Sequence, residues 1–377
     1  MSSLNYIAIL GRQPELGLVE LESLVGAKGV QIFGRQAALV GAELDVDRLG
    51  GVLKFAQVLY RGPVTPLRDL PVDVASLPVN ESKTSFGISA YGLRDTPKML
   101  AAAGLELKKQ LKVRGSVRLV LPARGLALSA AELRHNAVVR DGFELVVVVA
   151  NGEMVVAKTL GVQDIDWYSK RDYDRPARSA KVGMLPPKLA QVLVNTTSAS
   201  KVVDPFCGTG VVLQEARLLG REAAGSDLSG EMVDATRTNM VWLDSQVSRA
   251  LPAWAANLAD ARAVVLEPDV SIVSEGYLGP NLSHSPALPA LGTIKSELLA
   301  LYRDCFRNWA KQLPAGAQIS ICVPAWRVGK VWHYLGLVDE LASLGYTLKS
   351  FRAAQTPLLY ARDDQVVGRQ LLLLRKN

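Results

Sequence analysis

The segment VVDPFCGTGVVLQEA, residues 202–216, constrains the fold of this chain more than any other feature. An apolar run ends at Asp204, a loop containing Gly208 and Gly210 follows, and a helical pattern of apolar residues begins directly after it. Glycine at these two positions permits a tight turn and a close approach of the backbone to a ligand. A strand, a glycine loop and a helix in this order predict the first turn of a doubly wound, mostly parallel sheet.

The residues of this loop distinguish between two kinds of nucleotide cofactor. A nicotinamide site would carry a third glycine where this chain has Leu213, and would leave the helix N-terminus free for a pyrophosphate. Here an acid, Asp204, opens the loop, and an acid is a poor neighbour for phosphate. It suits a cation, and S-adenosylmethionine carries both an ammonium and a sulfonium group. We therefore predict S-adenosylmethionine as the cofactor.

Two further acids follow at positions where cofactor contacts are expected. Asp227 ends the next apolar stretch, and a carboxylate there accepts hydrogen bonds from both ribose hydroxyls. Asp260 is expected near the end of the following strand, where it would accept a hydrogen from the adenine amine; the alternative is an acid in a surface turn. The candidate cofactor-binding residues are Asp204, Pro205, Phe206, Gly208, Thr209, Gly210, Asp227, Leu228 and Asp260.

Length and composition indicate a globular enzyme of two or three domains. The chain has 377 residues, of which 49% are hydrophobic and 21% charged. No run of about 18 apolar residues occurs, so we expect no membrane-spanning helix, and the N-terminus lacks a secretory signal pattern. The three cysteines are widely spaced without a CxxC motif, which argues against a disulfide framework or a metal site and indicates a reducing, cytoplasmic location.

Four segments follow from the order of the expected elements. Residues 1–75 and residues 76–163 each have the pattern of a small α+β unit. Residues 164–186 are charged and aromatic with helix breakers, which indicates a connector. Residues 187–377 alternate between strands and helices and close with an antiparallel hairpin around Asp363 and Asp364, expected at the edge of the sheet.

Particular elements can be predicted within these segments. Thr96 and Ser129 are expected to cap the N-termini of helices, because their side chains accept hydrogen bonds from free backbone N–H groups. Helices are also expected at residues 45–58 and at residues 331–344, where apolar residues recur at helical spacing.

The excess of positive charge is confined to one third of the chain. Residues 81–188 hold 18 Lys and Arg against 11 Asp and Glu, whereas the rest of the chain holds 25 of each. This pattern is typical of a module that binds a polyanion, and the alternative is a solvated basic face. Within the connector, Arg171, Arg175 and Arg178 alternate with aromatic residues. They suit either contact with a nucleic-acid strand or, slightly favoured by the interleaved acids, a docking seam.

Taken together, these motifs resemble the THUMP-domain tRNA guanine-N2 methyltransferases of the guanosine-10 class. The specific part is DPFCGTG, with RPARSAKVGMLPPKLAQVLVN before it and GSD after it. SFGISAYG, LKVRGSVRLV, LSAAELRHN and VQDIDWYSKRDYDRP resemble the THUMP unit and its connector.

The resemblance implies a three-part architecture. A Rossmann-like class I methyltransferase domain at 187–377 would follow a ferredoxin-like domain at 1–75 and a THUMP-like RNA-binding domain at 76–163. tRNA would bind through the basic region 81–188. The need for a small activating partner subunit and the oligomeric state stay open.

Residues 274–277, Ser-Glu-Gly-Tyr, depart from the pattern of this family. The resemblance implies an acid, two prolines and an aromatic residue here. The acid and a backbone carbonyl would accept the hydrogens of a guanine amine, and the aromatic ring would stack on the flipped base. Tyr277 keeps the aromatic ring, whereas the acid is either lost to Ser274 or displaced to Glu275. Either Glu275 takes the role of the acid, with Gly276 letting the backbone adjust, or the site binds its ligands and transfers poorly or not at all.

The sequence therefore favours an S-adenosylmethionine-dependent RNA methyltransferase that acts on guanine N2 in tRNA. Its catalytic candidates are Ser274, Glu275 and Tyr277. The alternatives are amino-methylation of another RNA or DNA base, and a catalytically silent RNA-binding protein with a retained cofactor site. His284, in the following loop, is either a proton acceptor or a solvated histidine, and Cys322 is expected to be a buried strand cysteine.

Overall fold

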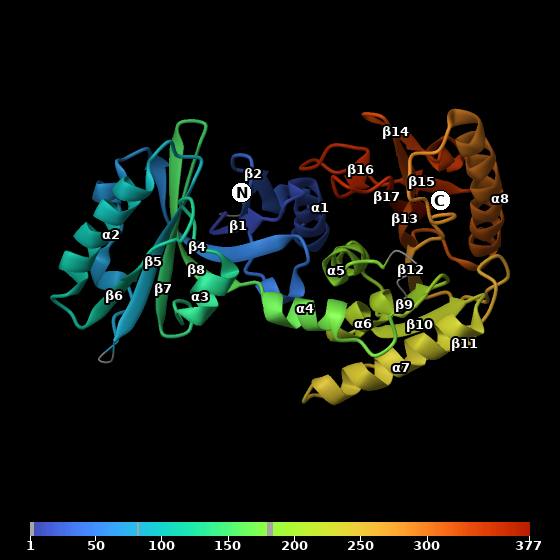
Figure 1. The fold of residues 1–377 in the computed structure, drawn as a ribbon, viewed down its shortest axis with the longest axis horizontal. Helices are drawn as coiled ribbons and strands as arrows, with labels where there is room; N and C mark the ends of the chain where they lie inside the picture. The colour runs from blue at the N-terminus through green and yellow to red at the C-terminus, as the bar shows by residue number, and fades with distance from the viewer. Residues whose placement is uncertain (1–3, 81–82, 179–183) are drawn as a thin grey trace. The chain divides into compact units, whose positions relative to one another are not determined.

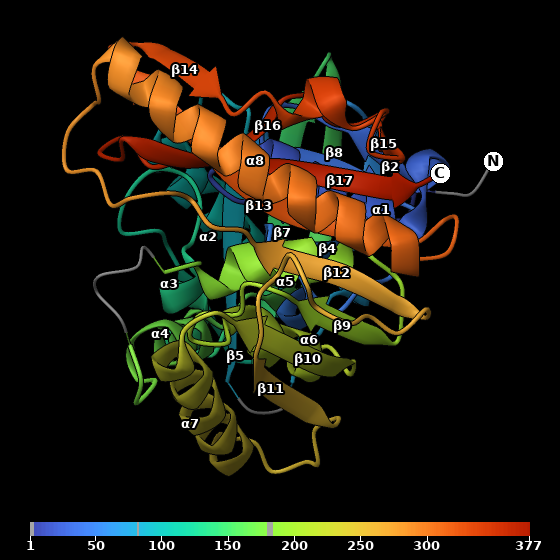
Figure 2. The same cartoon turned by 90° about the vertical axis from the view of Figure 1, so that its right-hand side faces the viewer.

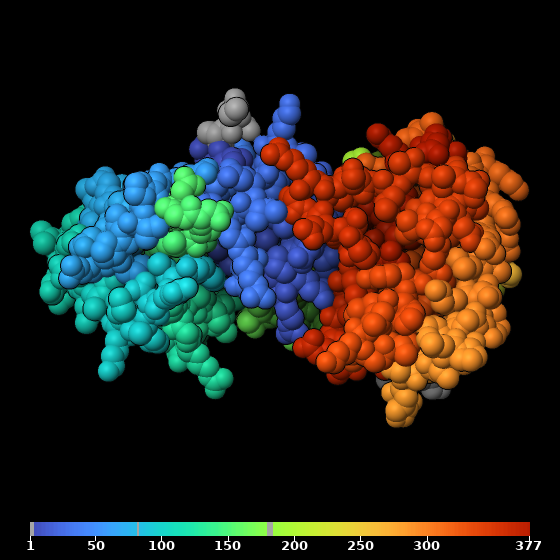
Figure 3. All heavy atoms as spheres, turned by 90° about the horizontal axis from the view of Figure 1, so that it is seen from above, coloured from blue at the N-terminus to red at the C-terminus, as the bar shows by residue number. Residues whose placement is uncertain are grey.

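The computed structural model of the protein describes residues 4–80, 83–178 and 184–377. Two short parts of the predicted basic region, 81–82 and 179–183, lie outside the described residues; the second also belongs to the predicted connector. The chain divides into two compact units, residues 1–167 and 168–377, which are shown as ribbons in Figure 1 and as filled atoms in Figure 3. The boundary falls within α4 (Ile165–Tyr173), close to the start of the predicted connector.

The first unit is built on one eight-stranded sheet with the order β2-β3-β1-β4-β8-β7-β5-β6. Its strands are β1 (Tyr6–Leu10), β2 (Val30–Ile32), β3 (Ala37–Val40), β4 (Val52–Pro63), β5 (Thr84–Tyr91), β6 (Val117–Val120), β7 (Gly142–Ala150) and β8 (Glu153–Val162). The long strand β4 pairs antiparallel with β1 on one side and with β8 on the other. The two segments expected at 1–75 and 76–163 therefore share a sheet, and no break in the sheet separates them.

Three α-helices complete the first unit: α1 (Pro14–Val25), α2 (Pro97–Leu111) and α3 (Ala130–His135). Four short 3-10 helices accompany them: η1 (Ala27–Gly29), η2 (Val46–Arg48), η3 (Leu67–Asp69) and η4 (Val74–Ser76). The two predicted caps are confirmed. The Thr96 side chain accepts a hydrogen bond from the Met99 N–H, and Ser129 forms a reciprocal capping box with Glu132. The apolar face of α2 packs on β5 and β7, including the stacked rings of Phe86 and Phe143.

The helix predicted at residues 45–58 is wrong. The chain forms only the short η2 there and then enters β4. Gly50 and Gly51 interrupt the helical pattern, and the buried carboxylate of Glu20 accepts hydrogen bonds from both of their N–H groups at 2.8 Å. Pairing of β4 with strands on both sides then outweighs the local helical spacing of its apolar residues.

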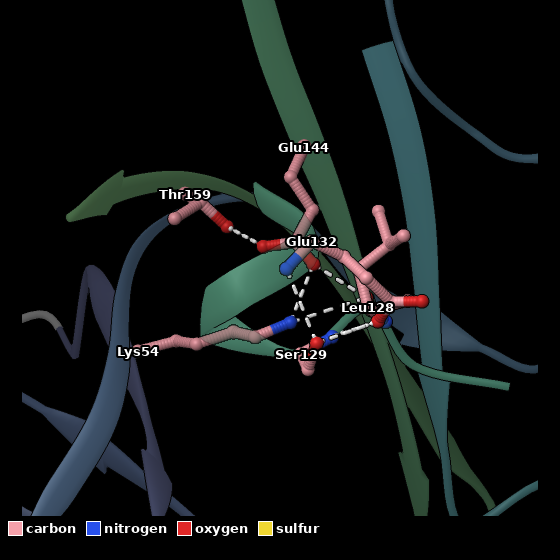
Figure 4. A network of polar contacts seen from close by, with 7 residues as sticks. Lys54, Leu128, Ser129, Glu132, Glu144 and Thr159 are labelled. Atoms are coloured by element: carbon pink, nitrogen blue, oxygen red, sulfur yellow. Dashed lines mark hydrogen bonds and ion pairs between the residues drawn. The ribbon is translucent and has the colours of Figure 1, made fainter. Parts of the chain in front are cut away.

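A buried polar network joins four strands of this sheet (Figure 4). Lys54 of β4 forms an ion pair with Glu144 of β7 at 2.5 Å, and both side chains are almost fully buried. Thr159 of β8 donates to the other Glu144 oxygen at 2.6 Å, and Ser89 of β5 bonds to the same carboxylate. The Leu128 N–H donates to the Ser89 hydroxyl at 2.8 Å. Lys54 belongs to the predicted segment 1–75, whereas its partners belong to 76–163, so the network links the two segments.

The second unit contains a nine-stranded sheet in which β11-β10-β9-β12-β13-β17-β15 are neighbours in that order. Pairing is parallel from β11 to β13 and antiparallel between β13, β17 and β15. Its strands are β9 (Lys201–Asp204), β10 (Glu222–Asp227), β11 (Trp254–Leu258), β12 (Val270–Glu275), β13 (Gln318–Val328), β14 (Val331–Tyr334), β15 (Tyr346–Leu348), β16 (Leu358–Tyr360) and β17 (Val367–Lys376). The mostly parallel sheet confirms the predicted fold class of this unit.

Helices cover both faces of this sheet, as Figures 1 and 2 show. They are α5 (Pro187–Asn195), α6 (Val211–Leu218), α7 (Gly230–Gln246) and α8 (Leu288–Gln312), with the short 3-10 helix η5 (Leu337–Glu340). The long α8 lies on one face, and α5 and α6 lie on the opposite face. Tyr302, Phe306 and Trp309 of α8 are fully buried in the core beneath it. Among the described residues, no helix combines the length and the apolar character needed to cross a membrane.

One prediction for the C-terminal part is corrected and another is confirmed. Residues 331–344 form β14 and η5 in place of one helix, because β14 pairs antiparallel with the end of β13. The predicted closing hairpin at the edge is confirmed: β16 pairs antiparallel with β17, and among the described strands β16 has no second neighbour. β17 is an interior strand that pairs with β13 from Gln318 to Trp326.

Candidate active site

The parallel strands bring their carboxyl ends to one edge of the sheet, and the candidate residues lie there. Asp204, Asp227 and Glu275 are the last residues of β9, β10 and β12. The chain passes from β9 to β10 on one side, whereas β12 pairs with β9 on the other side. This is the point at which the strand order reverses, where open α/β sheets bind their ligands.

The cofactor loop is held in a tight turn. Gly208 and Gly210 have φ angles of 51° and 85°, a region that favours glycine. The Asp227 carboxylate accepts from the Gly208 N–H at 3.0 Å, and the Thr236 hydroxyl of α7 donates to the Gly208 carbonyl at 2.8 Å. A side chain at Gly210 would press on Thr236 and Met240. Side chains of α7 therefore lie close against the loop.

Asp204 is buried, with only 2% of its surface exposed. Its carboxylate accepts a hydrogen bond from the Ser274 hydroxyl at 2.6 Å and one from the Phe206 N–H at 3.1 Å. Burial raises the pKa of this carboxyl to about 7. The two hydrogen bonds act in the opposite direction, but their effect is smaller. The acid that opens the loop is thus poised to change its charge near neutral pH.

Asp227 and Asp260, the two acids predicted to bind ribose and adenine, have different surroundings. The Asp227 oxygens accept from the Gly208 and Ser229 N–H groups, and the neighbouring Leu228 side chain is exposed. Asp260 follows β11 and is chelated by the Arg262 guanidinium at 2.6 to 3.0 Å, which lowers its pKa. It also accepts from the Arg262 N–H at 2.9 Å, so its contacts are those of a turn acid.

The catalytic candidates occupy the end of β12. Ser274 is fully buried and serves as a hydrogen-bond donor to Asp204. Glu275 forms an ion pair with Arg369 of β17, and the side chains of the pair are 15% and 4% exposed. Burial raises the pKa of Glu275, whereas Arg369 lowers it. Sequence reasoning did not find Arg369, because only the pairing of distant strands brings it to this site.

Gly276 and Tyr277 follow β12 directly, and hydrogen bonds from neighbouring elements fix their backbone. A side chain at Gly276 would overlap the Tyr302 hydroxyl of α8. That hydroxyl donates to the Tyr277 carbonyl at 2.9 Å, and the Gly276 N–H donates to the Cys322 carbonyl at 3.0 Å. Glycine is thus needed here for space, and the turn is fixed by Tyr302 in place of prolines. Tyr277 is 51% exposed, which leaves its ring accessible for stacking on a base.

Other predicted candidates have simpler surroundings. His284 is exposed and bonds to the adjacent Ser283 hydroxyl at 2.9 Å. Cys322 is buried on β13, and burial raises the pKa of its thiol, as expected for a structural cysteine. In the part of the chain that the structure describes, no group of three or more His, Cys, Asp or Glu residues could hold a metal ion.

The predicted connector residues also have a defined place in the second unit. Arg171 is buried in an ion pair with Glu215 of α6 at 2.7 Å, and Arg175 is buried beside the cofactor loop. Arg178 is exposed, with its guanidinium over the Tyr173 ring. The burial of Arg171 and Arg175 favours the docking role over contact with nucleic-acid phosphates for these two residues.

Comparison with known proteins indicates which protein family this site resembles. Residues 175–265 match the family model of the RMKL-like methyltransferase domain. This range contains the cofactor loop, Asp227 and Asp260. This part of the second unit is similar to RMKL-like methyltransferase domains. The match confirms the predicted methyltransferase domain and its cofactor, S-adenosylmethionine.

Curated relatives extend the similarity beyond the methyltransferase domain. A tRNA (guanine(10)-N2)-dimethyltransferase from Methanothermobacter thermautotrophicus is 29% identical over 219 residues, 55% of this chain and 57% of that protein. One of the same name from Pyrococcus abyssi is 26% identical over 241 residues, 62% of this chain and 67% of that protein. The chain thus aligns with little more than half of the first relative's length. These matches confirm the resemblance found in the motifs.

A solved structure matches the fold of the whole chain. The crystal structure of TrmN from Thermus thermophilus aligns over 99% of both chains with a TM-score of 0.54 and 19% sequence identity. At this identity the likeness concerns the fold alone. It confirms the predicted Rossmann-like fold within a longer α/β chain.

Proposed function

We propose that this protein transfers a methyl group from S-adenosylmethionine to the exocyclic N2 amine of a guanine in tRNA. The observation that carries the proposal is the position of Glu275 and Tyr277 beside the cofactor loop, at the end of the strand that neighbours β9. Two curated relatives named as tRNA (guanine(10)-N2)-dimethyltransferases support the choice of base and RNA.

Each residue of the site has a task in this reaction. When bound, S-adenosylmethionine supplies an electrophilic methyl group on a sulfonium. Glu275, paired with Arg369, accepts a hydrogen of the guanine amine and turns the nitrogen lone pair towards the methyl group. Tyr277 stacks on the flipped base and fixes its angle. Formation of the N–C bond breaks the S–C bond, and the amine proton leaves to Glu275 or water.

The first unit provides the surface for tRNA in this proposal. Residues 81–167 of the basic region belong to it, and they hold 12 Lys and Arg against 9 Asp and Glu, a surplus of 3 out of the region's 7. Lys and Arg there would neutralise phosphates, so binding should weaken steeply with salt. A THUMP-like role for residues 76–163 and a cytoplasmic location, consistent with three free cysteines, are parts of the same proposal.

A labelled-methyl assay tests the proposal. Unmodified tRNA, single-stranded DNA and duplex DNA are each incubated with the protein and labelled S-adenosylmethionine, and incorporation into nucleic acid is counted. The proposal expects label in tRNA only. Label in DNA would favour the alternative of amino-methylation of a DNA base.

A catalytically silent RNA-binding protein is the second candidate, and one observation favours it. Ser274 stands where the resemblance implies the acid, and the nearby Glu275 is already paired with Arg369. Replacing Glu275 by Gln separates the two candidates. Under the proposal, Glu275→Gln abolishes transfer and spares binding of S-adenosylhomocysteine. For a silent protein, the wild type itself binds cofactor and tRNA without incorporating label.

A further inference from the structure

Arg175, in the predicted connector, is buried against the cofactor loop. Only 2% of its surface is exposed, and its Nη1 donates to the Thr209 hydroxyl at 3.2 Å. Its Nη2 lies 3.6 Å from the Met184 sulfur, and its Nε is buried without a hydrogen-bond partner. Asp172 and Glu215 act on it electrostatically, but within the described ranges no acid forms an ion pair with it. A buried guanidinium held this way is costly, so stability alone does not explain it.

Asn239 of α7 joins the same part of the connector to the same loop residue. Its Nδ2 donates to the carbonyls of Thr209 and Ala177, both at 2.8 Å. Its Oδ1 accepts from the Ala177 N–H at 3.0 Å. Asn239 is fully buried, and both hydrogens of its Nδ2 and its Oδ1 form hydrogen bonds with Ala177 and Thr209.

These contacts enclose the Thr209 end of the cofactor loop. The side chain of Thr209 is fixed by Arg175 and its carbonyl by Asn239, while Thr236 fixes the Gly208 carbonyl from the same helix. The loop turns at Gly208 and Gly210 with positive φ, and because glycine can adopt many backbone conformations, contacts from neighbouring residues help to select this one. Part of that support comes from the connector, which lies outside the loop and its flanking helix.

We propose that the connector around Arg175 and Ala177 is a structural part of the cofactor site. Arg175 is a positioning residue: it holds Thr209, and thereby the loop, in the conformation that binds S-adenosylmethionine. Cofactor binding and ordering of the connector are then coupled, because each stabilises the conformation that the other requires. This inference rests on the methyltransferase domain and not on the identity of the methylated base.

Binding of S-adenosylhomocysteine to Arg175 variants, measured by calorimetry, tests the positioning role. Arg175→Met fills similar space without donors, and we expect its Kd to rise about tenfold, the loss expected for one charged hydrogen bond. Arg175→Lys keeps a cation and should recover part of the affinity. Thr238→Val is the matched control, because exposed Thr238 lies next to Asn239 and bonds only within its own helix. We expect its Kd to match the wild type.

Two further readouts separate positioning from general destabilisation. Because an unpaired buried cation is removed, Arg175→Met should unfold at a denaturant concentration equal to or above that of the wild type. In the wild-type protein, S-adenosylhomocysteine should slow hydrogen exchange at the Ala177 amide, which donates to Asn239. Unchanged exchange at Ala177, or a Kd for Arg175→Met within twofold of the wild type, would overturn the proposal. Neither readout depends on transfer to RNA.

Discussion

Glu275 at the end of β12 and Arg369 on β17 form a buried ion pair at the candidate active site. The two residues are far apart in sequence, and β13 lies between their strands. Arg369 also lies close to the Tyr360 ring and bonds to the Met184 carbonyl at 3.4 Å. The guanidinium is therefore anchored, and it opposes the rise that burial causes in the pKa of Glu275.

Removing Arg369 should make methyl transfer depend strongly on pH. The charged and titratable groups that face Glu275 are Arg369, Asp204 of β9, Cys322 of β13 and Tyr302 of α8. Arg369 is the one cation among these four groups, so in Arg369→Met the pKa of Glu275 rises further. Single-turnover transfer at neutral pH should fall at least about tenfold and recover as the pH rises, since each pKa unit is a factor of ten. The transfer rate of Arg369→Lys at neutral pH should lie between those of the wild type and Arg369→Met. A flat profile for Arg369→Met would contradict the assigned role of Glu275.

Asp204 should make the stability of the methyltransferase domain depend on pH. Burial raises its pKa from 3.8 to about 7 in the folded protein. Protonated Asp204 thus contributes stability that is fully present below about pH 3.8 and is lost as the pH rises to about 7. Asp204→Asn cannot ionise, so its free energy of unfolding should improve relative to the wild type between these two pH values. Denaturant titrations at several pH values measure the difference, and a constant difference would show that Asp204 is ionised throughout.

Gly276→Ala should disturb the end of β12. The added methyl group would overlap the Tyr302 hydroxyl, and overpacking of this kind costs about 1–3 kcal/mol. Displacement of Tyr277 should lower transfer more than it lowers cofactor affinity. Tyr302→Phe removes the clashing oxygen, so the double variant should regain part of the lost stability. Equal stability of Gly276→Ala and the wild type in thermal unfolding would show that the segment is loosely held.

The buried network of the first unit should be sensitive to loss of one partner. Glu144→Gln removes the charge that balances Lys54 in the interior, which we expect to cost about 3–5 kcal/mol of unfolding free energy. Replacing both residues, as Lys54→Met with Glu144→Gln, should restore much of this loss. Denaturant unfolding measures whether the double variant has a higher free energy of unfolding than Glu144→Gln. A single variant as stable as the double one would mean that Lys54 sheds its charge at little cost.

Local sequence patterns predicted the arrangement of the candidate cofactor loop and missed most contacts of the candidate catalytic residues. Asp204, the glycine loop and Asp227 lie within one β-α-β stretch, where spacing along the chain determines position in space. Arg369 of β17 and Tyr302 of α8 contact the end of β12, and a local sequence pattern cannot predict contacts between residues so far apart in the chain. The same limit explains the helix predicted at 331–344, where pairing of β14 with β13 overrides the helical spacing.

The departure from the family pattern at 274–277 could be located in sequence but not interpreted there. Gly276 suggested a loosened turn, whereas Tyr302 and Cys322 hold it in the folded chain. Whether Glu275 had a partner depended on a strand that pairs only in the tertiary structure.

Nucleoside mass spectrometry of tRNA after incubation with the protein and S-adenosylmethionine tests the central claim most directly. The wild type should produce guanosine methylated at N2, and Glu275→Gln should produce none while its affinity for S-adenosylhomocysteine is kept. Methylation at another base, or full turnover by Glu275→Gln, would contradict the account. So would unmodified tRNA after incubation with a wild-type protein that binds both ligands.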